Sequence, residues 1–502
     1  MSKSRGSVPP TRISILRDTE PRAGGAYVLY WMTAARRISY NFALERAVHW
    51  ARELGKGLVV LEPLRIGYPW ASDRFHAFVM DGMRDNEAAL SGSGALYHPY
   101  VEPEAGAGKG LVEELAKDAC VVVTDEAPFF FLPRMLAATS PRIPVRFEAI
   151  DGNGLVPLRA VTQSFTFAHQ FRRFVQKTIR PHLEVLPASD PLRGAELVPV
   201  ALPRAVSERW PRVPASDLAA PAALVSRLAI DHRVPIVEDR GGHAFAHKRL
   251  AAFVRSRLSA YHEDRSHPDD GAASGLSFHL HFGHLSAHEI FASLARHTDW
   301  SSEKLGAKAH GRREGFWNLS DAADAYLDEL VTWRELGLAR ASRGRDTIGW
   351  ADLPAFARTT LEAHASDPRP HAYDLGTLEE GRTHDPVWNA TMRQLREEGR
   401  IQNYLRMLWG KKILEWSRRP EDALETMVTL NDRWSVDGRD PSSYTNIGWV
   451  LGLYDRPWAP ERPIFGMVRY MSSDAAMKKL RMKEWMARWG EKGTSQRSLA
   501  LD

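Results

Sequence analysis

Cysteine is nearly absent from the sequence of 502 residues, in which Cys120 is alone. A single thiol excludes a disulfide-stapled scaffold, a zinc site built on cysteines and an iron–sulfur cluster held by thiolates. Long apolar runs are missing as well, since none approaches the roughly 18 residues that a membrane span requires. The first residues, MSKSRGSVPPTR, lack the apolar segment of a secretory signal. We therefore expect a cytoplasmic protein with no membrane contact.

The excess of one charge sign is also small, with 67 lysines and arginines against 62 aspartates and glutamates. The formal charge of +5 does not by itself establish nucleic-acid binding. It permits such binding only if the cations gather on one surface.

Tryptophan, in contrast, is abundant, with 16 residues compared with 13 tyrosines. Twelve of the 16 lie from Trp300 onward. Because a stable fold does not need this surplus, we expect the second half of the chain to use some of these indoles for its function.

Short apolar runs alternate with a helical pattern over the first 150 residues, at 26–32, 57–64, 95–101, 120–125 and 144–151. The segment NFALERAVHWAREL (41–54) has the helical period. Near-continuous apolar runs of this length are typical of strands buried on both faces of a parallel sheet. The pattern predicts a Rossmann-like α/β domain over residues 24–160.

A proline-rich stretch of weak periodicity, clearest at 203–216, predicts a linker over residues 161–240. Beyond it, segments of helical period follow one another at 243–265, 322–342 and 387–417, without a convincing strand between them. We therefore expect a large all-α domain over residues 241–490.

Two motifs resemble known sites but fail on inspection. AGAGKG (105–110) imitates a phosphate loop, yet Pro103 occupies its first glycine position and Gly110 replaces the Ser or Thr after Lys109. We interpret it as a surface loop. The histidines of HLHFGHLSAHE (279–289) have metal-like spacing, but no neighbouring residue completes a convincing ligand set. The sequence therefore predicts no metal site.

Four residues of the helical half carry alternative interpretations. Ser274 and Ser277 precede an apolar helical run, where hydroxyl and N–H groups suit either an anion such as a pyrophosphate or simple helix capping. Glu329 and Trp333 are four residues apart and share a helix face. An indole beside a carboxylate suits a flat, hydrogen-bonding substrate, although a buried tryptophan beside an exposed glutamate is the simpler reading.

Three tryptophans also share helical surfaces. Trp409 and Trp416 are seven residues apart, which places them on one face about 10 Å apart along the axis. Trp388 lies upstream, where a helix is expected to start. Core packing explains each indole alone, whereas a row of indoles could also pass an electron.

Several long motifs in the chain resemble class II cyclobutane pyrimidine dimer photolyases of the photolyase/cryptochrome family. At the C-terminal end they are WGKKILEWS, LNDRWSVDGRDPSSY, GWVLGLYDRPW and ERPIFGMVRYM. Upstream they are THDPVWNA, DELVTWREL, SGLSFHLHFGHLSA, GGHAFAHKRLAAFVRSRLSAYHEDR and YWMTAARRISYNFALERA. The resemblance covers residues 26–489.

This resemblance implies an α/β domain followed by a helical FAD-binding domain, and an enzyme that uses light to split pyrimidine dimers in DNA by electron transfer from reduced FAD. It places Arg265, Trp333, Met407 and Trp449 at the dimer pocket. Glu329 would bind the dimer, and Asn431 would face the flavin. Trp388, Trp409 and Trp416 would reduce the flavin. The residues expected to bind the cofactor are Tyr261, Ser274, Leu276, Ser277, Arg406, Asn431, Asp437 and Asp440.

The family also allows other functions and a second pigment. A cryptochrome-like photoreceptor is the main alternative, but the retained Glu329, Trp333, Met407 and Trp449 favour repair. Repair of six-four photoproducts would need an active-site histidine where this chain has Gln402. An antenna pigment, a deazaflavin or a folate, could occupy the α/β domain. We expect a monomer that associates with the nucleoid when bound to damaged DNA.

Overall fold

A six-stranded sheet lies at the centre of the N-terminal part of the computed structural model, which describes residues 8–491. The strand order is β1-β6-β5-β2-β3-β4, with all neighbours parallel except β1 and β6. The five expected strands are present and confirm the α/β fold: β2 (Tyr27–Trp31), β3 (Gly57–Leu64), β4 (Leu96–Val101), β5 (Ala119–Glu126) and β6 (Arg146–Asp151).

β1 (Ile13–Arg17) is a strand that the sequence patterns did not reveal. It pairs antiparallel with β6 at the edge of the sheet, so the sheet begins before residue 24, the expected start of the domain. All five residues of β1 are partly or fully exposed to solvent. An edge strand of this kind needs no continuous apolar run, which is why the pattern missed it.

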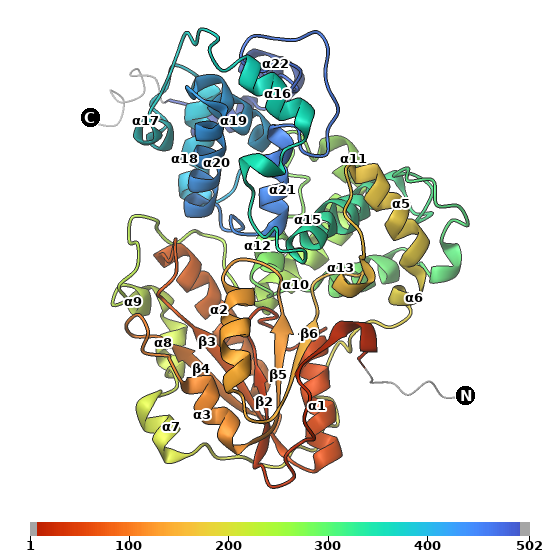
Figure 1. Cartoon of the computed structure of the whole chain (residues 1–502), viewed down its shortest axis with the longest axis vertical. Helices are drawn as coiled ribbons and strands as arrows, with labels where there is room; N and C mark the ends of the chain where they lie inside the picture. Colours follow the sequence, from red (N-terminus) through yellow and green to blue (C-terminus); the bar gives the residue numbers. More distant parts are fainter. Residues whose placement is uncertain (1–7, 492–502) are drawn as a thin grey trace, which may run out of the picture.

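Both faces of the sheet are covered by helices, as Figure 1 shows in its lower half. On β2, Val28 and Tyr30 pack in the core with α1, whereas Leu29 and Trp31 pack in the core with α3. This double burial is the physical reason for the continuous apolar runs. The α-helices that lie between the strands in the chain are α1 (Phe42–Leu54), α2 (Asp73–Leu90), α3 (Leu111–Asp118) and α4 (Leu132–Thr139).

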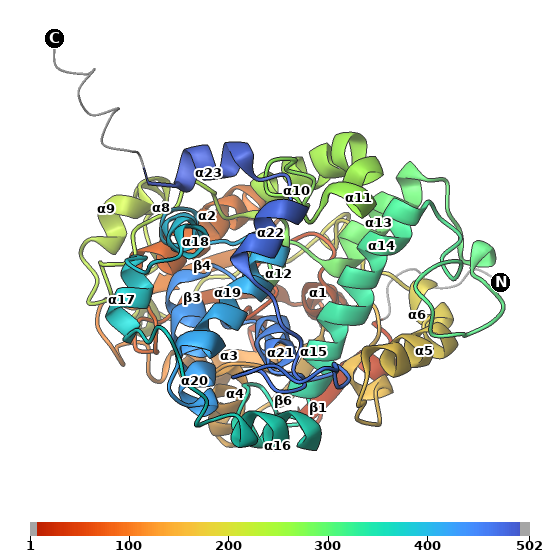
Figure 2. The same cartoon turned by 90° about the horizontal axis from the view of Figure 1, so that it is seen from above.

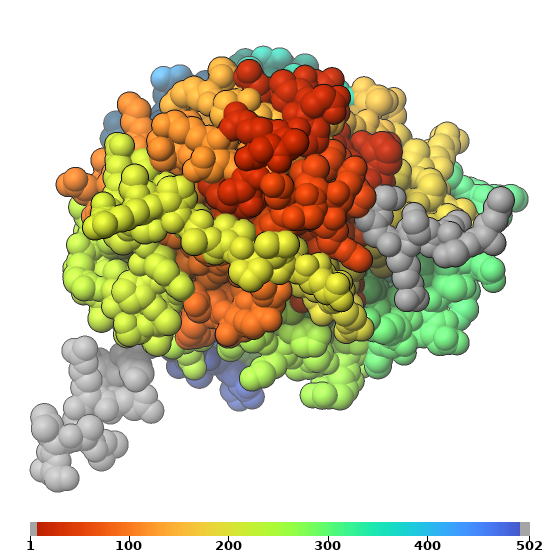
Figure 3. All heavy atoms as spheres, turned by 90° about the horizontal axis from the view of Figure 1, so that it is seen from below, coloured from red at the N-terminus to blue at the C-terminus, as the bar shows by residue number. Residues whose placement is uncertain are grey.

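The segment expected as a linker divides between the two regions. Its first part contains α5 (Ala168–Thr178) and α6 (Arg180–Leu183), and Phe171 of α5 is buried in the helical core. Its second part, with α7 (Arg204–Arg209), α8 (Ala215–Ala219) and α9 (Pro221–Val225), buries Trp210 and Leu218 against the α/β domain. Figure 3 shows this yellow-green stretch lying across the red and orange surface. The segment therefore wraps over the surfaces of both regions and packs against them.

The helical region runs from α10 (His243–Ala252) to α23 (Lys483–Trp489) and confirms the predicted all-α half. Figure 2 shows α18, α19, α20 and α21 grouped together. The other α-helices are α11 (Tyr261–Asp264), α12 (Ser277–His281), α13 (Ala287–His297), α14 (Asp321–Leu327), α15 (Arg334–Ala341), α16 (Ala355–Ala363), α17 (Leu375–Glu380), α18 (Pro386–Glu398), α19 (Asn403–Trp416), α20 (Pro420–Trp434), α21 (Pro441–Val450) and α22 (Ser473–Lys479).

The long helical pattern at 387–417 is two helices, because the chain turns at Gly399 between α18 and α19. Gly399 has φ +70°, and a Cβ there would lie 2.6 Å from Cγ2 of Val436. Only glycine adopts this backbone in so tight a contact without strain. Among residues 8–491, no helix is both long and apolar enough to cross a bilayer.

Candidate functional site

A cavity of about 490 Å³ in the helical region gathers residues from widely separated parts of the chain. Its walls come from α11 and the residue after it, the start of α12, the segment 328–333 and α21. Nine residues expected at the flavin or the dimer line it: Tyr261, Arg265, Ser274, Ser277, Glu329, Trp333, Asp437, Asp440 and Trp449. The folding of the chain therefore brings together most of the site expected from sequence.

The carboxylate of Glu329 lies beside Arg265, whose Nη1 donates a hydrogen bond to it. Segment 328–333 is a π-helical turn rather than the regular α-helix expected there. Desolvation raises the pKa of Glu329, and the charge of Arg265 opposes that shift. A carboxyl with a raised pKa can keep its proton more readily than a free one and donate a hydrogen bond.

Two half-buried indoles form one wall of the cavity. Trp333 and Trp449 stack with their ring centroids 4.9 Å apart and an angle of 26° between the ring planes. They come from the end of the π-helical turn and from α21, respectively. A stacked pair of this kind offers a flat apolar surface on which another planar ring can lie.

The carboxylates of Asp437 and Asp440 and the hydroxyl of Ser277 also line the cavity. Burial raises the pKa of Asp437, but Arg406 and hydrogen bonds from Ser435 and Ser277 outweigh it and hold that pKa below the usual value. Burial acts in the same direction on Asp440, yet its other partners lower that pKa to about 2. Both side chains are therefore ionised acceptors at neutral pH.

Four expected residues are not among the described residues that line the cavity: Leu276, Arg406, Met407 and Asn431. Arg406 Nη2 lies 3.4 Å from Asp437 Oδ1 and so acts on the cavity through that carboxylate. The Nδ2 of Asn431 donates to the carbonyl of Gly438 at 2.7 Å. Leu276 and Met407 pack in or against the apolar cores.

The three tryptophans expected as an electron path form a continuous row. Trp388 stacks on Trp409 with ring centroids 6.0 Å apart and meets Trp416 edge-on at 5.3 Å. All three are buried between α18 and α19. The spacing along α19 separates Trp409 from Trp416 by about 10 Å along the axis, and Trp388 of α18 contacts both of them.

The sequence patterns missed other residues of the site. Tyr373 packs edge-on against Trp416 at 5.3 Å, and its hydroxyl lies 2.6 Å from Nδ1 of His384. Gln402, noted above for the absence of a histidine, caps α19 through its side-chain oxygen and donates from Nε2 to the Arg265 carbonyl at 2.6 Å. The contacts of Tyr373 with Trp416 and of Gln402 with Arg265 have no sequence signal, because each joins separate segments. The cavity wall also contains Arg172, Arg313, Tyr326, Arg334, Asn403, Ser442 and Asn446.

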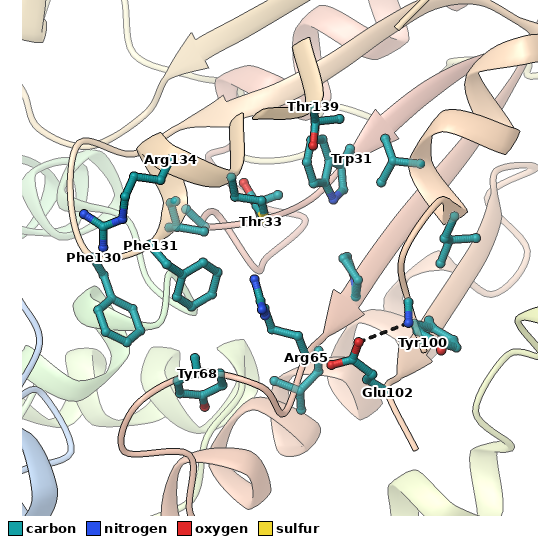
Figure 4. A pocket seen from close by; sticks show the side chains of 18 of the residues that line it. Trp31, Thr33, Arg65, Tyr68, Tyr100, Glu102, Phe130, Phe131, Arg134 and Thr139 are labelled. Carbon is teal, nitrogen blue, oxygen red and sulfur yellow. Dashed lines mark hydrogen bonds between the residues drawn. The ribbon is translucent and has the colours of Figure 1, made fainter. Parts of the chain in front are cut away.

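A second cavity, of about 580 Å³, lies at the carboxyl ends of β2, β3 and β4 (Figure 4). Aromatic rings line it, and Figure 4 shows Arg65 reaching toward Phe131, with its guanidinium carbon 5.1 Å from that ring's centroid. Ligands of open α/β sheets bind at this edge. The loop interpreted as a surface loop, 105–110, also lines the cavity, but the N–H groups of Gly106 and Gly108 are taken by Glu102.

Comparison with known proteins identifies the family, although no family model matches the chain. A deoxyribodipyrimidine photo-lyase of Methanothermobacter thermautotrophicus is 30% identical over 486 residues, covering 95% of this chain and 97% of that protein. The chain belongs to the photolyase/cryptochrome family. A photo-lyase of Oryza sativa, also 30% identical, covers 92% of this chain and 87% of its own length.

Solved structures of photolyases and cryptochromes share the fold. A bacterial class III photolyase of Agrobacterium tumefaciens gives a TM-score of 0.65 at 18% identity, covering 93% of this chain and 86% of that one. A Synechocystis cryptochrome gives 0.61 at 16%, covering 94% and 89%. An archaeal photolyase of Sulfolobus tokodaii, solved with two FAD molecules, gives 0.61 at 14%, covering 94% and 91%.

Proposed function

We propose that this photolyase-family protein is a class II enzyme that uses light to split cyclobutane pyrimidine dimers in DNA. One observation carries the proposal: the Glu329 carboxyl and the stacked Trp333–Trp449 pair line a single cavity. A flipped-out dimer of two adjacent pyrimidines needs flat apolar walls with a few polar groups at its edges. The names of the near-full-length relatives support the same activity.

The residues of the cavity fit FAD by the chemistry of their side chains. The Ser274 and Ser277 hydroxyls can donate to a pyrophosphate, and the ionised Asp437 and Asp440 can accept from ribose or ribityl hydroxyls. Tyr261 and Arg265 complete that wall. FAD, when bound and reduced, supplies the light-excited electron for dimer cleavage.

The protein's own part in cleavage is to hold the lesion. Trp333 and Trp449 provide the apolar surface for the two pyrimidine rings and exclude water from them. The protonated carboxyl of Glu329 would donate a hydrogen bond to a pyrimidine carbonyl where negative charge develops, and burial, which raises the pKa of this group, favours that protonated form. Arg265 fixes the orientation of that carboxyl.

The tryptophan row has a separate role, which is to keep the cofactor in its reduced form. Trp409, Trp388 and Trp416 are in sequential contact and carry an electron inward from the surface side of α18 and α19. Tyr373 extends the row by one aromatic ring at a partly exposed position.

The test is light-dependent repair of an oligonucleotide that carries one cyclobutane dimer. Purified protein with chemically reduced flavin should restore the oligonucleotide under blue light and leave it unchanged in the dark. A protein that binds and reduces flavin, yet repairs nothing in the light, would contradict the proposal and favour a photoreceptor. The same assay with a six-four photoproduct should show no repair.

We also propose that the second cavity holds an antenna pigment. Its aromatic walls and Arg65 suit a flat, anionic chromophore such as a deazaflavin or a folate. Adding either pigment to purified protein should add a band to the excitation spectrum of the repair reaction. If neither pigment binds or contributes to repair, the cavity has another use.

A further inference from the structure

Two histidines of α10 and one glutamate of α13 converge away from both cavities. His243 Nε2 lies 3.0 Å from Glu289 Oε2, and His247 Nδ1 lies 2.9 Å from Glu289 Oε1. The ligand atoms of these three side chains all lie within 4.8 Å of one another. The histidines are four residues apart in the helix, so they project from the same face.

The cluster has one buried ligand, Glu289, and two histidines that are partly exposed to solvent. Glu289 is 1% exposed, so packing around α13 holds its carboxylate in place. The His247 side chain is 57% exposed and that of His243 is 25% exposed. An ion can therefore enter from solvent, and water can complete its coordination.

The start of α10 is held in position by bonds from other elements. The N–H of Gly242 donates to His284 Nδ1 at 2.9 Å, and the N–H of Ala244 donates to Asp85 Oδ2 at 2.9 Å. These contacts fix the helix turn that carries His243. A ligand set whose backbone is already in place loses little conformational freedom on binding.

We propose that His243, His247 and Glu289 bind one divalent ion of the zinc class. Two imidazoles and one carboxylate, with water in a fourth position, form a ligand set that zinc accepts at distances of about 2.0–2.2 Å. On binding, each imidazole presents the lone pair of the nitrogen that now faces Glu289, and its proton moves to the other ring nitrogen or to solvent. The two hydrogen bonds to Glu289 give way to bonds with the ion.

The ion would join two segments that lead to the helical cavity. α10 continues toward Tyr261 and Arg265, and α13 follows the α12 helix that begins at Ser277. Crosslinking α10 to α13 should stabilise the folded state, because the unfolded chain offers no assembled site. This inference requires neither light nor DNA and so stands apart from the proposed repair activity.

Zinc titration tests the site directly. The flavin-loaded full chain, without an affinity tag and freed of metal by a chelator, is titrated with zinc chloride in a calorimeter. We expect one saturable site per chain, and a higher thermal unfolding midpoint with zinc than with chelator. His247→Ala should weaken zinc binding by more than about tenfold and remove the thermal shift.

The matched control is His297→Ala, which removes an exposed histidine of α13 outside the cluster and should bind zinc as the native chain does. Glu289→Gln, which keeps the size of the side chain, gives a second variant should His247→Ala fail to fold. Native protein without a saturable site, or equal affinity in His247→Ala or Glu289→Gln, would overturn the proposal. The cluster would then be a pair of histidine–carboxylate contacts.

Discussion

The carboxyl of Glu335 is a buried acid that connects the two regions of the molecule. It accepts hydrogen bonds from the backbone N–H groups of Leu155, at 2.7 Å, and Val156, at 3.0 Å. Burial raises its pKa from 4.5 to about 7, even though these hydrogen bonds favour the charged form. The folded protein therefore takes up a proton at this site over a pH range in which the unfolded chain has lost it.

This shift predicts a pH dependence of stability. Because the folded pKa lies above the unfolded one, the contribution of Glu335 is fully present below pH 4.5 and is lost as the pH rises through about 7. The difference is about 3 kcal/mol. The measurement is the midpoint of urea unfolding at a series of pH values. In Glu335→Gln this midpoint should fall less steeply between pH 4.5 and about 7 than in the native protein. Glu53→Gln, at an exposed position of α1, is the control and should keep the native slope.

The raised pKa of Glu329 predicts how its variants repair DNA. Glu329→Leu should lower the rate of dimer repair by about tenfold or more. It removes the proposed hydrogen bond to the pyrimidine carbonyl, which gains negative charge during cleavage. Glu329→Gln keeps a donor and should retain more activity than Glu329→Leu. The measurement is repair per absorbed photon with chemically reduced flavin. Equal activity in the native and Leu proteins would remove Glu329 from the reaction.

At the scale of elements, the tryptophan row depends on the crossing of α18 and α19. Trp388 contacts both Trp409 and Trp416, so its replacement breaks the row in the middle. We expect Trp388→Phe, and equally Trp409→Phe, to abolish photoreduction of oxidised flavin. Repair should persist once the flavin is reduced chemically, because in the proposed mechanism the row serves only to reduce the resting cofactor.

The control for the row is Trp434→Phe, a buried indole of α20 that donates to Glu379 at 2.6 Å. It should leave photoreduction intact. Transient absorption after a blue pulse reports the result. Normal photoreduction in Trp388→Phe would show that the electron takes another path.

At the scale of the whole molecule, one cation joins the α/β domain to the helical region. Arg74 of α2 is 1% exposed and donates to the carbonyls of Pro235, Leu395, Arg396 and Trp434. Burial lowers its pKa to about 9, which still leaves it charged at neutral pH. The two regions therefore share a buried polar contact as well as apolar packing.

Removal of this contact should destabilise the junction. Arg74→Met leaves several buried carbonyls without a donor, at a cost of about 3 kcal/mol or more. Differential scanning calorimetry should show a lower unfolding midpoint or a split into two transitions. Arg84→Met, on the same helix with the side chain 39% exposed, should change the midpoint little. An unchanged profile in Arg74→Met would mean that apolar packing alone holds the regions together.

The sequence by itself determined the five parallel strands, the helical second half and the family. Strands buried on both faces must be apolar along their length, and that requirement is visible locally, as in residues 57–64. It also supplied nine residues of the cavity wall through motifs whose order along the chain was recognisable. These are features that short-range patterns encode.

Only the tertiary structure decided which distant residues touch. In the folded chain Trp388 contacts both Trp409 and Trp416, β1 pairs with β6, and His243 lies within hydrogen-bond distance of Glu289. Each of these contacts joins segments that are separate in the chain, and their packing is set by the whole core rather than by the period of either segment. A periodic pattern specifies which face of an element is buried, but not which neighbour buries it.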